Sequence, residues 1–467
     1  MKRALCDLTA MELLRAYRRK ALSPVELLKA VFTRIETFNP EVNAFRVVDE
    51  QGALKQALES EARWMRGEPR GPLDGVPVSI KDLLLTKGMS TLFGSRTVDP
   101  DQPWDEDAPS VARCRERGAI ILGKTNTPEF GYKIVTESPL TGVTRNPWDL
   151  TRSPGGSSGG AAVAVATGMG PLAIGTDAGG SIRIPACWTG TFGLKPTFRR
   201  VPAYPNTAFG TLSNVGPITR TVEDAALLMT VIAQPDPRDW HALPHAGRDY
   251  LIGFNEGVRG LRIAYSPDLG IAEVEADIAT CVAKAAQVFA EMGAHVEEVR
   301  PPNLEPFRHI HSVQWVVVVA SLVRNMSAEQ RALLDPPLLE LAKVGETITT
   351  QKYFDALAGR EALGQMMHLF FSDYDLLITP TFHASAPPVP GVPKELDEAP
   401  RLTSWWNQTM QPAASIPCGV TSAGIPVGLQ VIGPRYADAL VLRACRAYES
   451  ARGDFPLPPV GAQGSLR

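Results

Sequence analysis

The sequence has little cysteine, and its cysteines lack a spacing that binds metal. Among the 467 residues there are six cysteines, and no two of them form a C-x-x-C motif. This scatter argues against a zinc site, a redox motif and a disulfide framework. We therefore expect reduced thiols in a cytoplasmic protein. The six are Cys6, Cys114, Cys187, Cys281, Cys418 and Cys445.

Long apolar runs are missing as well. Charged residues, among them Glu12, Arg15 and Arg18, interrupt residues 1–28, so we expect no signal-peptide core there. No stretch elsewhere reaches the roughly 18 uncharged apolar residues that a membrane-spanning helix needs. Residues 316–322 are apolar but too short, and we expect them in a buried helix. The sequence gives no reason to expect a membrane partner.

Neither sign of charge is in clear excess. The chain has 47 Lys and Arg residues against 50 Asp and Glu residues, for a formal net charge of -3. Such a balance does not favour nucleic acid or an anionic membrane as a partner. The expected ligand is a small molecule that is not a polyanion.

The order of expected elements indicates a large α/β protein. Residues 1–65 are expected to form a helical N-terminal scaffold, and strands and helices alternate over residues 71–230. This alternation predicts a sheet covered by helices. Residues 235–257 are expected to form a loop, and a helical stretch over residues 305–372 is expected to cap part of the sheet and its cleft.

Two glycine-framed serine clusters are the most informative feature of the chain. Residues 155–160 (GGSSGG) and 177–181 (DAGGS) flank an expected apolar helix and an expected apolar strand. About nine helical residues and about five strand residues span similar lengths, so Ser157 and Ser181 can meet at one end of both elements. Backbone N–H groups of the second cluster can then point into one cavity, as an oxyanion requires. A flexible linker would explain the first cluster alone, but not the pair.

Two other motifs suggest ligands that their context does not support. Residues 118–125 (GAIILGKT) match a phosphate-binding loop, but the four intervening residues are expected to be a strand, and Pro128 follows closely. His309 and His311 flank a single residue, yet no carboxylate cluster adjoins them, so a structural or surface role is favoured over metal binding. We therefore expect no nucleotide, metal or cofactor.

The general base could be a histidine or a lysine. Residues 155–159 (GGSSG) fit the G-x-S-x-G nucleophile elbow, with histidines from His241 onward as candidate bases. An elbow needs a strand that runs into the serine, whereas residues 146–154 are expected to form a proline-broken loop. Lys81 follows an expected strand at residues 76–80, and a desolvated lysine can accept a proton, although most lysines lie on the surface. The sequence favours lysine and keeps the Ser/His/Asp arrangement as the competitor.

Five motifs in this order resemble the amidase signature family of serine hydrolases. They are GVPVSIKD at 75–82, GKTNTPEFG at 123–131, SPGGSSGG at 153–160, GTDAGGSIRIPA at 175–186 and GLKPT at 193–197. Weaker matches reach both ends of the chain, and the separation of 24 residues between Ser157 and Ser181 also agrees with this family. The resemblance implies a single large domain over residues 1–467, with a central mixed β-sheet covered by helices on both faces.

The resemblance also implies roles for individual residues. Ser181 is the expected nucleophile, Ser157 is the bridging serine on a cis peptide bond, and Lys81 is the base that draws a proton through Ser157. The expected oxyanion donors are the N–H groups of Ala178, Gly179, Gly180 and Ser181. Supporting or substrate-binding roles are expected for Asn126, Thr127, Ser158, Asp177 and Arg183, the last of which is expected to form an ion pair with Asp177.

Three functions are consistent with these motifs. The leading hypothesis is hydrolysis of a small carboxamide to a carboxylic acid and ammonia or an amine, through an acyl-enzyme on Ser181. One alternative is a glutaminase-type subunit of a glutamyl-tRNA amidotransferase, which acts with partner chains. The other is a non-catalytic binding scaffold of the same fold. A homodimer is one option for the assembly. Phe93, Phe209, Trp405 and Trp406 could wall an acyl pocket, although aromatic residues are more often part of the core.

Overall fold

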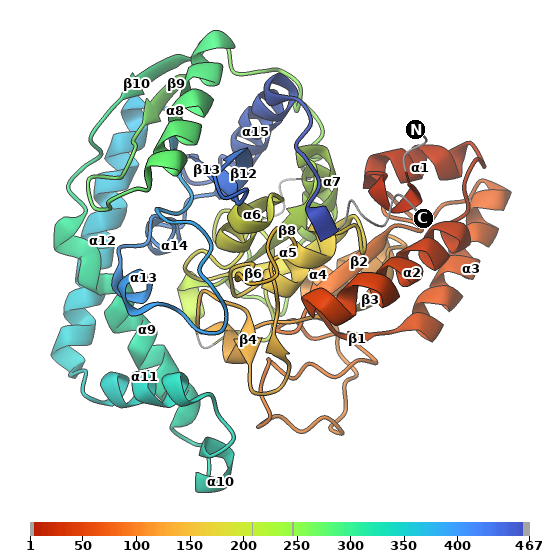
Figure 1. Cartoon of the computed structure of the whole chain (residues 1–467), viewed down its shortest axis with the longest axis horizontal. Helices are drawn as coiled ribbons and strands as arrows, with labels where there is room; N and C mark the ends of the chain where they lie inside the picture. The colour runs from red at the N-terminus through yellow and green to blue at the C-terminus, as the bar shows by residue number, and fades with distance from the viewer. Residues whose placement is uncertain (1–3, 208, 245–246, 461–467) are drawn as a thin grey trace.

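A mixed sheet lies at the centre of the computed structural model, which describes residues 4–207, 209–244 and 247–460 (Figure 1). Eleven strands form it in the order β1-β3-β2-β6-β8-β7-β12-β13-β11-β9-β10. Strands β3, β2 and β6 are parallel, as are β11, β9 and β10, and the pairings from β6 to β11 between these groups are antiparallel. The strands are β1 (Phe45–Val48), β2 (Pro77–Lys81), β3 (Ile120–Thr125), β6 (Leu172–Asp177), β7 (Phe192–Lys195), β8 (Asn214–Thr219), β9 (Arg262–Tyr265), β10 (His295–Glu298), β11 (Leu376–Pro380), β12 (Ala413–Val420) and β13 (Pro426–Ile432), with a separate pair β4 (Glu137–Ser138) and β5 (Gly142–Val143).

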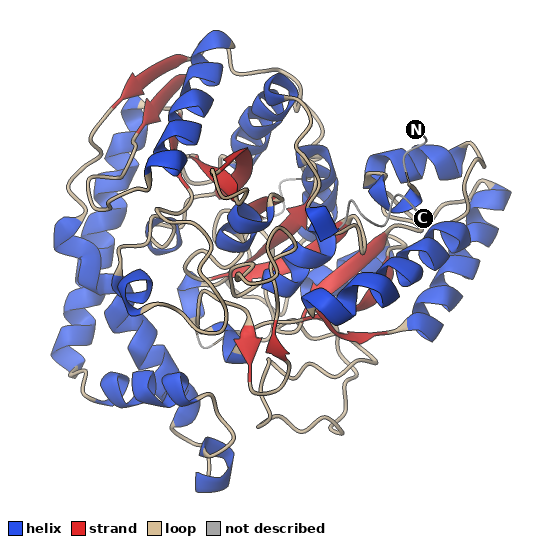
Figure 2. Cartoon of the chain, viewed as in Figure 1, coloured by secondary structure: helices blue, strands red, loops and turns tan. Residues whose placement is uncertain are grey.

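Helices cover both faces of this sheet (Figure 2). Along β6, Ala173 packs under α5, whereas Leu172 and Ile174 point to the opposite face, where α7 lies. This confirms the predicted α/β fold. The helices are α1 (Ala10–Arg18), α2 (Pro24–Val42), α3 (Glu50–Arg66), α4 (Pro109–Glu116), α5 (Gly159–Ala166), α6 (Arg183–Thr189), α7 (Val222–Ile232), α8 (Ala276–Glu291), α9 (Arg308–Val323), α10 (Ala328–Arg331), α11 (Pro336–Glu346), α12 (Thr350–Asp373), α13 (Lys394–Glu398), α14 (Trp405–Gln408) and α15 (Asp438–Arg452).

The N-terminal segment is helical with one exception. A capping box of Thr9 and Glu12 begins α1, because each side chain satisfies a backbone N–H of the other residue. Asn43 ends α2 in the left-handed conformation, and the next residues form the edge strand β1, antiparallel to β3. The expectation of helix throughout was therefore wrong at Phe45–Val48, because four residues are too few to show an alternating pattern.

The elements that carry the serine clusters lie where the sequence predicts them. Helix α5 leads away from Ser157, and β6 leads back toward Ser181. Strand β2 runs parallel to β6, with Ile80 opposite Ile174, and it ends on Lys81. The lysine and both serine clusters therefore reach the same edge of the sheet.

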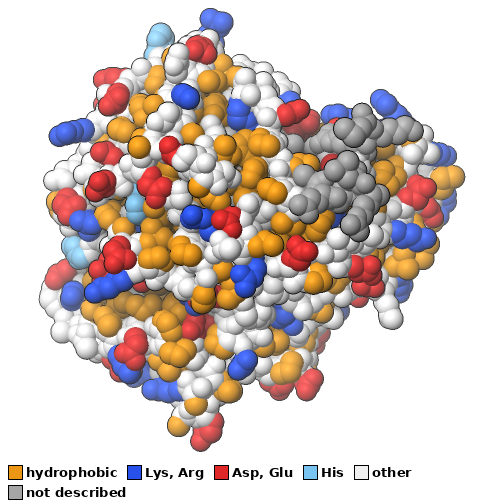
Figure 3. Space-filling model, viewed as in Figure 1, with side chains coloured by type: hydrophobic (Ala, Val, Ile, Leu, Met, Phe, Trp, Pro, Cys, Tyr) orange, Lys and Arg blue, Asp and Glu red, His pale blue; other side chains and the backbone are white. Residues whose placement is uncertain are grey.

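Residues 305–372 are largely the helices α9 to α12 (Figure 1). Helix α12 packs on the sheet, because Leu363, Met367 and Phe371 share an apolar cluster with residues of β9, β11 and β13. Helices α9 and α11 pack together through Val319, Leu338 and their neighbours, and Tyr132 of the central region joins this cluster. On the face shown in Figure 3, apolar side chains gather over this part of the molecule, with charged side chains around them. None of the helices in the described ranges is long and apolar enough to cross a membrane.

Candidate active site

Lys81 is buried at the end of β2 and contacts three hydroxyl groups. Its Nζ lies 2.7 Å from Ser157 Oγ, 2.9 Å from Ser158 Oγ and 2.9 Å from Thr176 Oγ1. Burial lowers the pKa of the Lys81 amine well below its usual range, and the attraction of Asp177 offsets this only in part. A neutral amine in this position can accept a proton from a neighbouring hydroxyl.

The two serine clusters are in direct contact. The N–H of Ser158 donates to the carbonyl oxygen of Ser181 at 3.0 Å. The peptide bond between Gly156 and Ser157 is cis. Gly131 lies close on the other side, since a Cβ there would come within 3.1 Å of Ser157 Oγ. Ser157 thus lies between Lys81 and Gly131, and its neighbour Ser158 contacts the second cluster.

The Ser181 hydroxyl and three backbone N–H groups face no protein partner. Within the described part of the chain, nothing accepts a hydrogen bond from the N–H groups of Ala178, Gly179 and Ser181, and nothing bonds to Ser181 Oγ. Gly180 differs from the expected set of donors, because its N–H donates to Asp177 Oδ1 at 2.8 Å. An oxyanion in this turn can therefore meet three free donors instead of the four that the sequence suggested.

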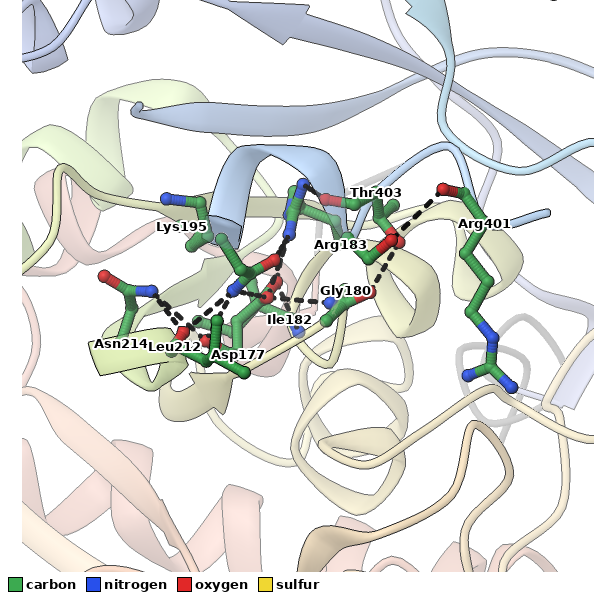
Figure 4. Close-up of polar contacts among 12 residues, drawn as sticks. Asp177, Gly180, Ile182, Arg183, Lys195, Leu212, Asn214, Arg401 and Thr403 are labelled. Carbon is green, nitrogen blue, oxygen red and sulfur yellow. Dashed lines mark hydrogen bonds and ion pairs between the residues drawn. The ribbon is translucent and has the colours of Figure 1, made fainter. Parts of the chain in front are cut away.

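A buried ion pair shapes this turn (Figure 4). Arg183 Nε and Nη2 each donate to one oxygen of Asp177 at 2.9 Å. Burial by itself would raise the pKa of the Asp177 carboxyl, but the charge and hydrogen bonds of Arg183 outweigh it and hold the pKa well below its usual range. The same carboxylate accepts the N–H groups of Gly180 and Ile182, at 2.8 and 3.1 Å. The expected ion pair is present, and it holds the backbone of the turn.

Breaking this ion pair should destabilise the protein and lower its activity. Asp177→Asn keeps the shape of the side chain but leaves Arg183 buried without its counter-charge, which typically costs about 3–5 kcal/mol of unfolding free energy. The pair of Arg15 and Glu223, 3.6 Å apart with an exposed arginine and a half-buried glutamate, offers a control at the surface. Glu223→Gln should change stability by less than about 1 kcal/mol. Urea unfolding and amide turnover measure both effects, and equal behaviour of the two variants would contradict this role of Asp177.

Asn126 and Thr127 stabilise a neighbouring turn and do not reach the cluster around Lys81. Asn126 Nδ2 donates to the backbone carbonyl oxygen of Asn43 at 2.8 Å. The backbone carbonyl oxygen of Asn126 accepts from the N–H of Gly160 at 3.3 Å. Thr127 Oγ1 donates to the carbonyl oxygen of Pro128 at 3.2 Å. Both side chains are buried. Sequence reasoning missed Thr176, whose only signal was a hydroxyl near the end of an apolar strand.

The structure places the phosphate-loop match and the elbow match in other surroundings. Lys124, in the segment that matches a phosphate loop, is buried within β3 and donates to Thr86 Oγ1 at 3.0 Å and to Thr91 Oγ1 at 2.7 Å. It cannot face a phosphate. Residues 146–154 form no regular strand, so Ser157 is not on an elbow, and no histidine in the described ranges is bonded to Ser157 or Ser181. In the same ranges no cluster of three or more metal-ligating side chains occurs.

A cavity of about 880 Å³ lies beside His311, whose ring packs against Gly179 of the turn with the free N–H groups; Lys81, Ser157 and residues 178–181 are not part of the cavity wall. Its wall includes His311 and Trp315 of α9 and Trp405 and Gln408 of α14. Phe209 packs against Trp315, with ring centroids 4.4 Å apart, and belongs to the same apolar cluster as Ala178 and Leu212. Of the other aromatic candidates, Trp406 is fully buried in the core, and Phe93 stacks on Phe130.

Comparisons with known proteins agree with this geometry. The Amidase family model matches residues 26–442. An acylamidase from Rhodococcus erythropolis is 37% identical over 461 residues, which cover 95% of each chain. The crystal structure of a bacterial aryl acylamidase of the amidase signature family superposes with a TM-score of 0.88, at 33% identity over 98% of this chain and 97% of that one. A glutamyl-tRNA(Gln) amidotransferase chain from Thermotoga maritima gives a TM-score of 0.82, at 31% identity over 98% of this chain and 99% of that one. The chain therefore belongs to the Amidase family of amidase signature enzymes, and it is a hydrolase that acts on the carbon–nitrogen bonds of amides.

Proposed function

We propose that the chain hydrolyses small carboxamides through an acyl-enzyme on Ser181, with Lys81 as the base and Ser157 as the relay between them. The observation that carries this proposal is the contact of 2.7 Å between Lys81 Nζ and Ser157 Oγ, with the amine fully buried. A charged lysine would be a donor only, whereas a neutral one has the lone pair that a base needs.

In the proposed steps, each proton that one group loses is accepted by another. Ser157 passes its proton to Lys81 and takes that of Ser181, whose Oγ attacks the amide carbonyl carbon. The N–H groups of Ala178, Gly179 and Ser181 stabilise the resulting oxyanion. As the carbon–nitrogen bond breaks, the proton returns along the relay to the leaving nitrogen. A water molecule then repeats the attack, which releases the acid and restores Ser181.

The surroundings of Ser181 and of Ser158 support this relay. The Ser181 hydroxyl has no competing partner in the described residues, so it is free to donate to Ser157 when substrate binds. Ser158 Oγ accepts from Lys81 and donates to the carbonyl oxygen of Thr176 at 3.1 Å. We propose that Ser158 and Thr176 position the amine, and that Asp177 and Arg183 hold the oxyanion turn.

For the substrate, we propose acyl anilides and related N-acyl amides. Part of the cavity wall is apolar and aromatic, with Trp315, Val316 and Trp405, and suits an aromatic or alkyl group. Charged side chains line the rest of the wall: Lys133, Glu137, Arg308, Glu340, Asp397, Glu398 and Arg401. The names of two relatives, acylamidase and aryl acylamidase, agree with this class. We predict a kcat/KM for acetanilide about 10-fold above that for L-glutamine, because the phenyl ring can pack on an aromatic side chain such as Trp315, a contact worth about 0.5–1.5 kcal/mol. Released aniline and ammonia measure the two rates, and a preference for glutamine would contradict the proposal.

The second candidate is a glutaminase-type subunit of a glutamyl-tRNA amidotransferase. Its specific support is the match of nearly the whole chain to the corresponding chains of such enzymes. This candidate predicts glutamine hydrolysis that depends on a co-purified partner chain. Turnover of acetanilide by the isolated chain, without such a partner, would favour the first candidate.

We further propose a division of roles along the chain, in a cytoplasmic protein. Residues 1–65 would serve as a scaffold, residues 71–230 would carry the catalytic groups, and residues 305–372 would cap the cleft. The free state of all six cysteines supports the cytoplasmic location. A homodimer stays a prediction for the assembly, which light scattering of the purified chain would test.

A further inference from the structure

His311 lies against the turn that carries the free N–H groups. A Cβ built on Gly179 would lie 3.0 Å from Cε1 and 3.1 Å from Nε2 of His311. Gly179 does not have a positive φ, so its backbone does not demand glycine. The imidazole ring occupies the place that a side chain at this position would need. The Nε2 edge of His311 therefore faces the proposed oxyanion site.

The partner of the other ring nitrogen indicates where the proton of His311 sits. Gln408 Nε2 lies 3.3 Å from His311 Nδ1. With the Gln408 amide in this orientation, its nitrogen donates to Nδ1, and a neutral ring then carries its proton on Nε2. Burial, together with the charge of Arg401, lowers the pKa of His311 to about 3, so the ring is neutral at ordinary pH. His311 thus presents an Nε2–H donor.

This donor is held rigidly and has no protein acceptor. The His311 ring packs on Trp315, with centroids 5.2 Å apart. Trp315 is itself fixed, because its Nε1 donates to the carbonyl oxygen of Tyr132 at 3.1 Å and its ring packs on Phe209. No residue in the described ranges accepts a hydrogen bond from His311 Nε2. The ring lines the cavity of about 880 Å³, where a bound molecule can supply the acceptor.

We propose that His311 Nε2–H donates a hydrogen bond to an acceptor atom of the substrate close to the scissile amide. His311 then selects amides that carry an ether, carbonyl or ring-nitrogen acceptor there over alkyl analogues of the same shape. The inference rests on the proposed function and extends it to the choice of substrate. The physical reason is that His311 is half-buried, and an alkyl analogue would cut its donor off from water without pairing it, which disfavours that analogue.

Two matched substrate pairs test this selection. Methoxyacetanilide and butyranilide differ by an oxygen in place of a methylene group on the acyl side. N-(2-methoxyethyl)acetamide and N-butylacetamide differ in the same way on the amine side. The measured quantity in each pair is kcat/KM for the ether divided by kcat/KM for its alkyl analogue. The inductive effect of the oxygen is the same for every enzyme variant. A partly unfolded preparation lowers the rates of both members of a pair equally. A change in this ratio between variants therefore reports the hydrogen bond.

His311→Phe keeps an aromatic ring against Trp315 but removes the donor, and His311→Leu is a second variant in case the first folds poorly. We expect the ratio of one pair to fall about tenfold in both variants, as for the loss of one hydrogen bond. His311→Gln, which can place an N–H at a similar point, should recover part of the ratio. His309→Phe, on an exposed position of the same helix, should leave it unchanged.

Unchanged ratios for both pairs in His311→Phe and His311→Leu would overturn the inference, even where absolute rates fall. If the wild-type chain turns over these amides and the ratios in the two variants are unchanged, the proposed function still holds. Absence of turnover of all four amides by the wild-type chain would instead overturn the proposed function, and with it this inference.

Discussion

Replacing Ser181 with alanine should abolish the hydrolysis of every amide and ester while the fold is kept. We expect kcat to fall by about 10⁴-fold or more, because a reaction through an acyl-enzyme cannot begin without its nucleophile. The folded state should lose little, since the Ser181 hydroxyl makes no hydrogen bond within the described residues. Turnover of acetanilide and thermal unfolding of the same sample measure both effects.

Ser158→Ala is the matched control for this variant. Ser158 is also a buried hydroxyl in the glycine-framed clusters, but it contacts the Lys81 amine. Its loss should reduce kcat by roughly 10-fold to 100-fold, as for a residue that positions a proton acceptor. Equal losses in the two variants, or substantial activity in Ser181→Ala, would contradict the roles assigned to these serines.

Lys81→Met should lower kcat/KM by about 10³-fold or more, since it removes the proton acceptor and leaves a side chain of similar length. In the wild-type enzyme, kcat/KM should rise with pH and reach a plateau as Lys81 loses its proton. Because burial lowers the pKa of Lys81, this rise should lie well below the value of about 10.4 for an ordinary lysine. A rise centred near pH 10 would contradict a buried neutral base.

The same pKa shift predicts how stability depends on pH. Between the lowered pKa of folded Lys81 and about 10.4, the unfolded chain binds one more proton than the folded chain. Stability therefore increases with pH across this window, and Lys81→Met lacks this contribution. Urea unfolding should show wild type gaining stability relative to Lys81→Met between neutral pH and about pH 10. A constant difference would indicate that Lys81 is charged in the folded state.

Local sequence patterns predicted the framework of the site. The glycine-framed clusters, the helix after Ser157 and the strand before Ser181 all depend on residues close together in the chain. The strand that ends on Lys81 was predicted for the same reason. Their meeting at one sheet edge followed from matched lengths of α5 and β6, and the contact of Ser158 N–H with the carbonyl oxygen of Ser181 bears this out.

The parts that the sequence could not predict depend on contacts between distant segments. Thr176 reaches Lys81 only because β2 and β6 pair in parallel with Ile80 opposite Ile174. Asn407 reaches the Asp177 carboxylate from α14, 230 residues further along the chain, and donates to its Oδ1 at 2.9 Å. His311 lies far from Gly179 in the sequence, so its immediate neighbours suggested only a structural or surface role.

The measurement that tests the central claim most directly is covalent labelling with a serine-reactive fluorophosphonate, followed by mass spectrometry of the digested protein. We predict a single adduct on Ser181 in the wild-type chain, much slower labelling in Lys81→Met, and none in Ser181→Ala. An adduct on Ser157 or Ser158 in the wild-type chain, or persistent labelling of Ser181→Ala at the wild-type rate, would contradict the assignment of Ser181 as the nucleophile.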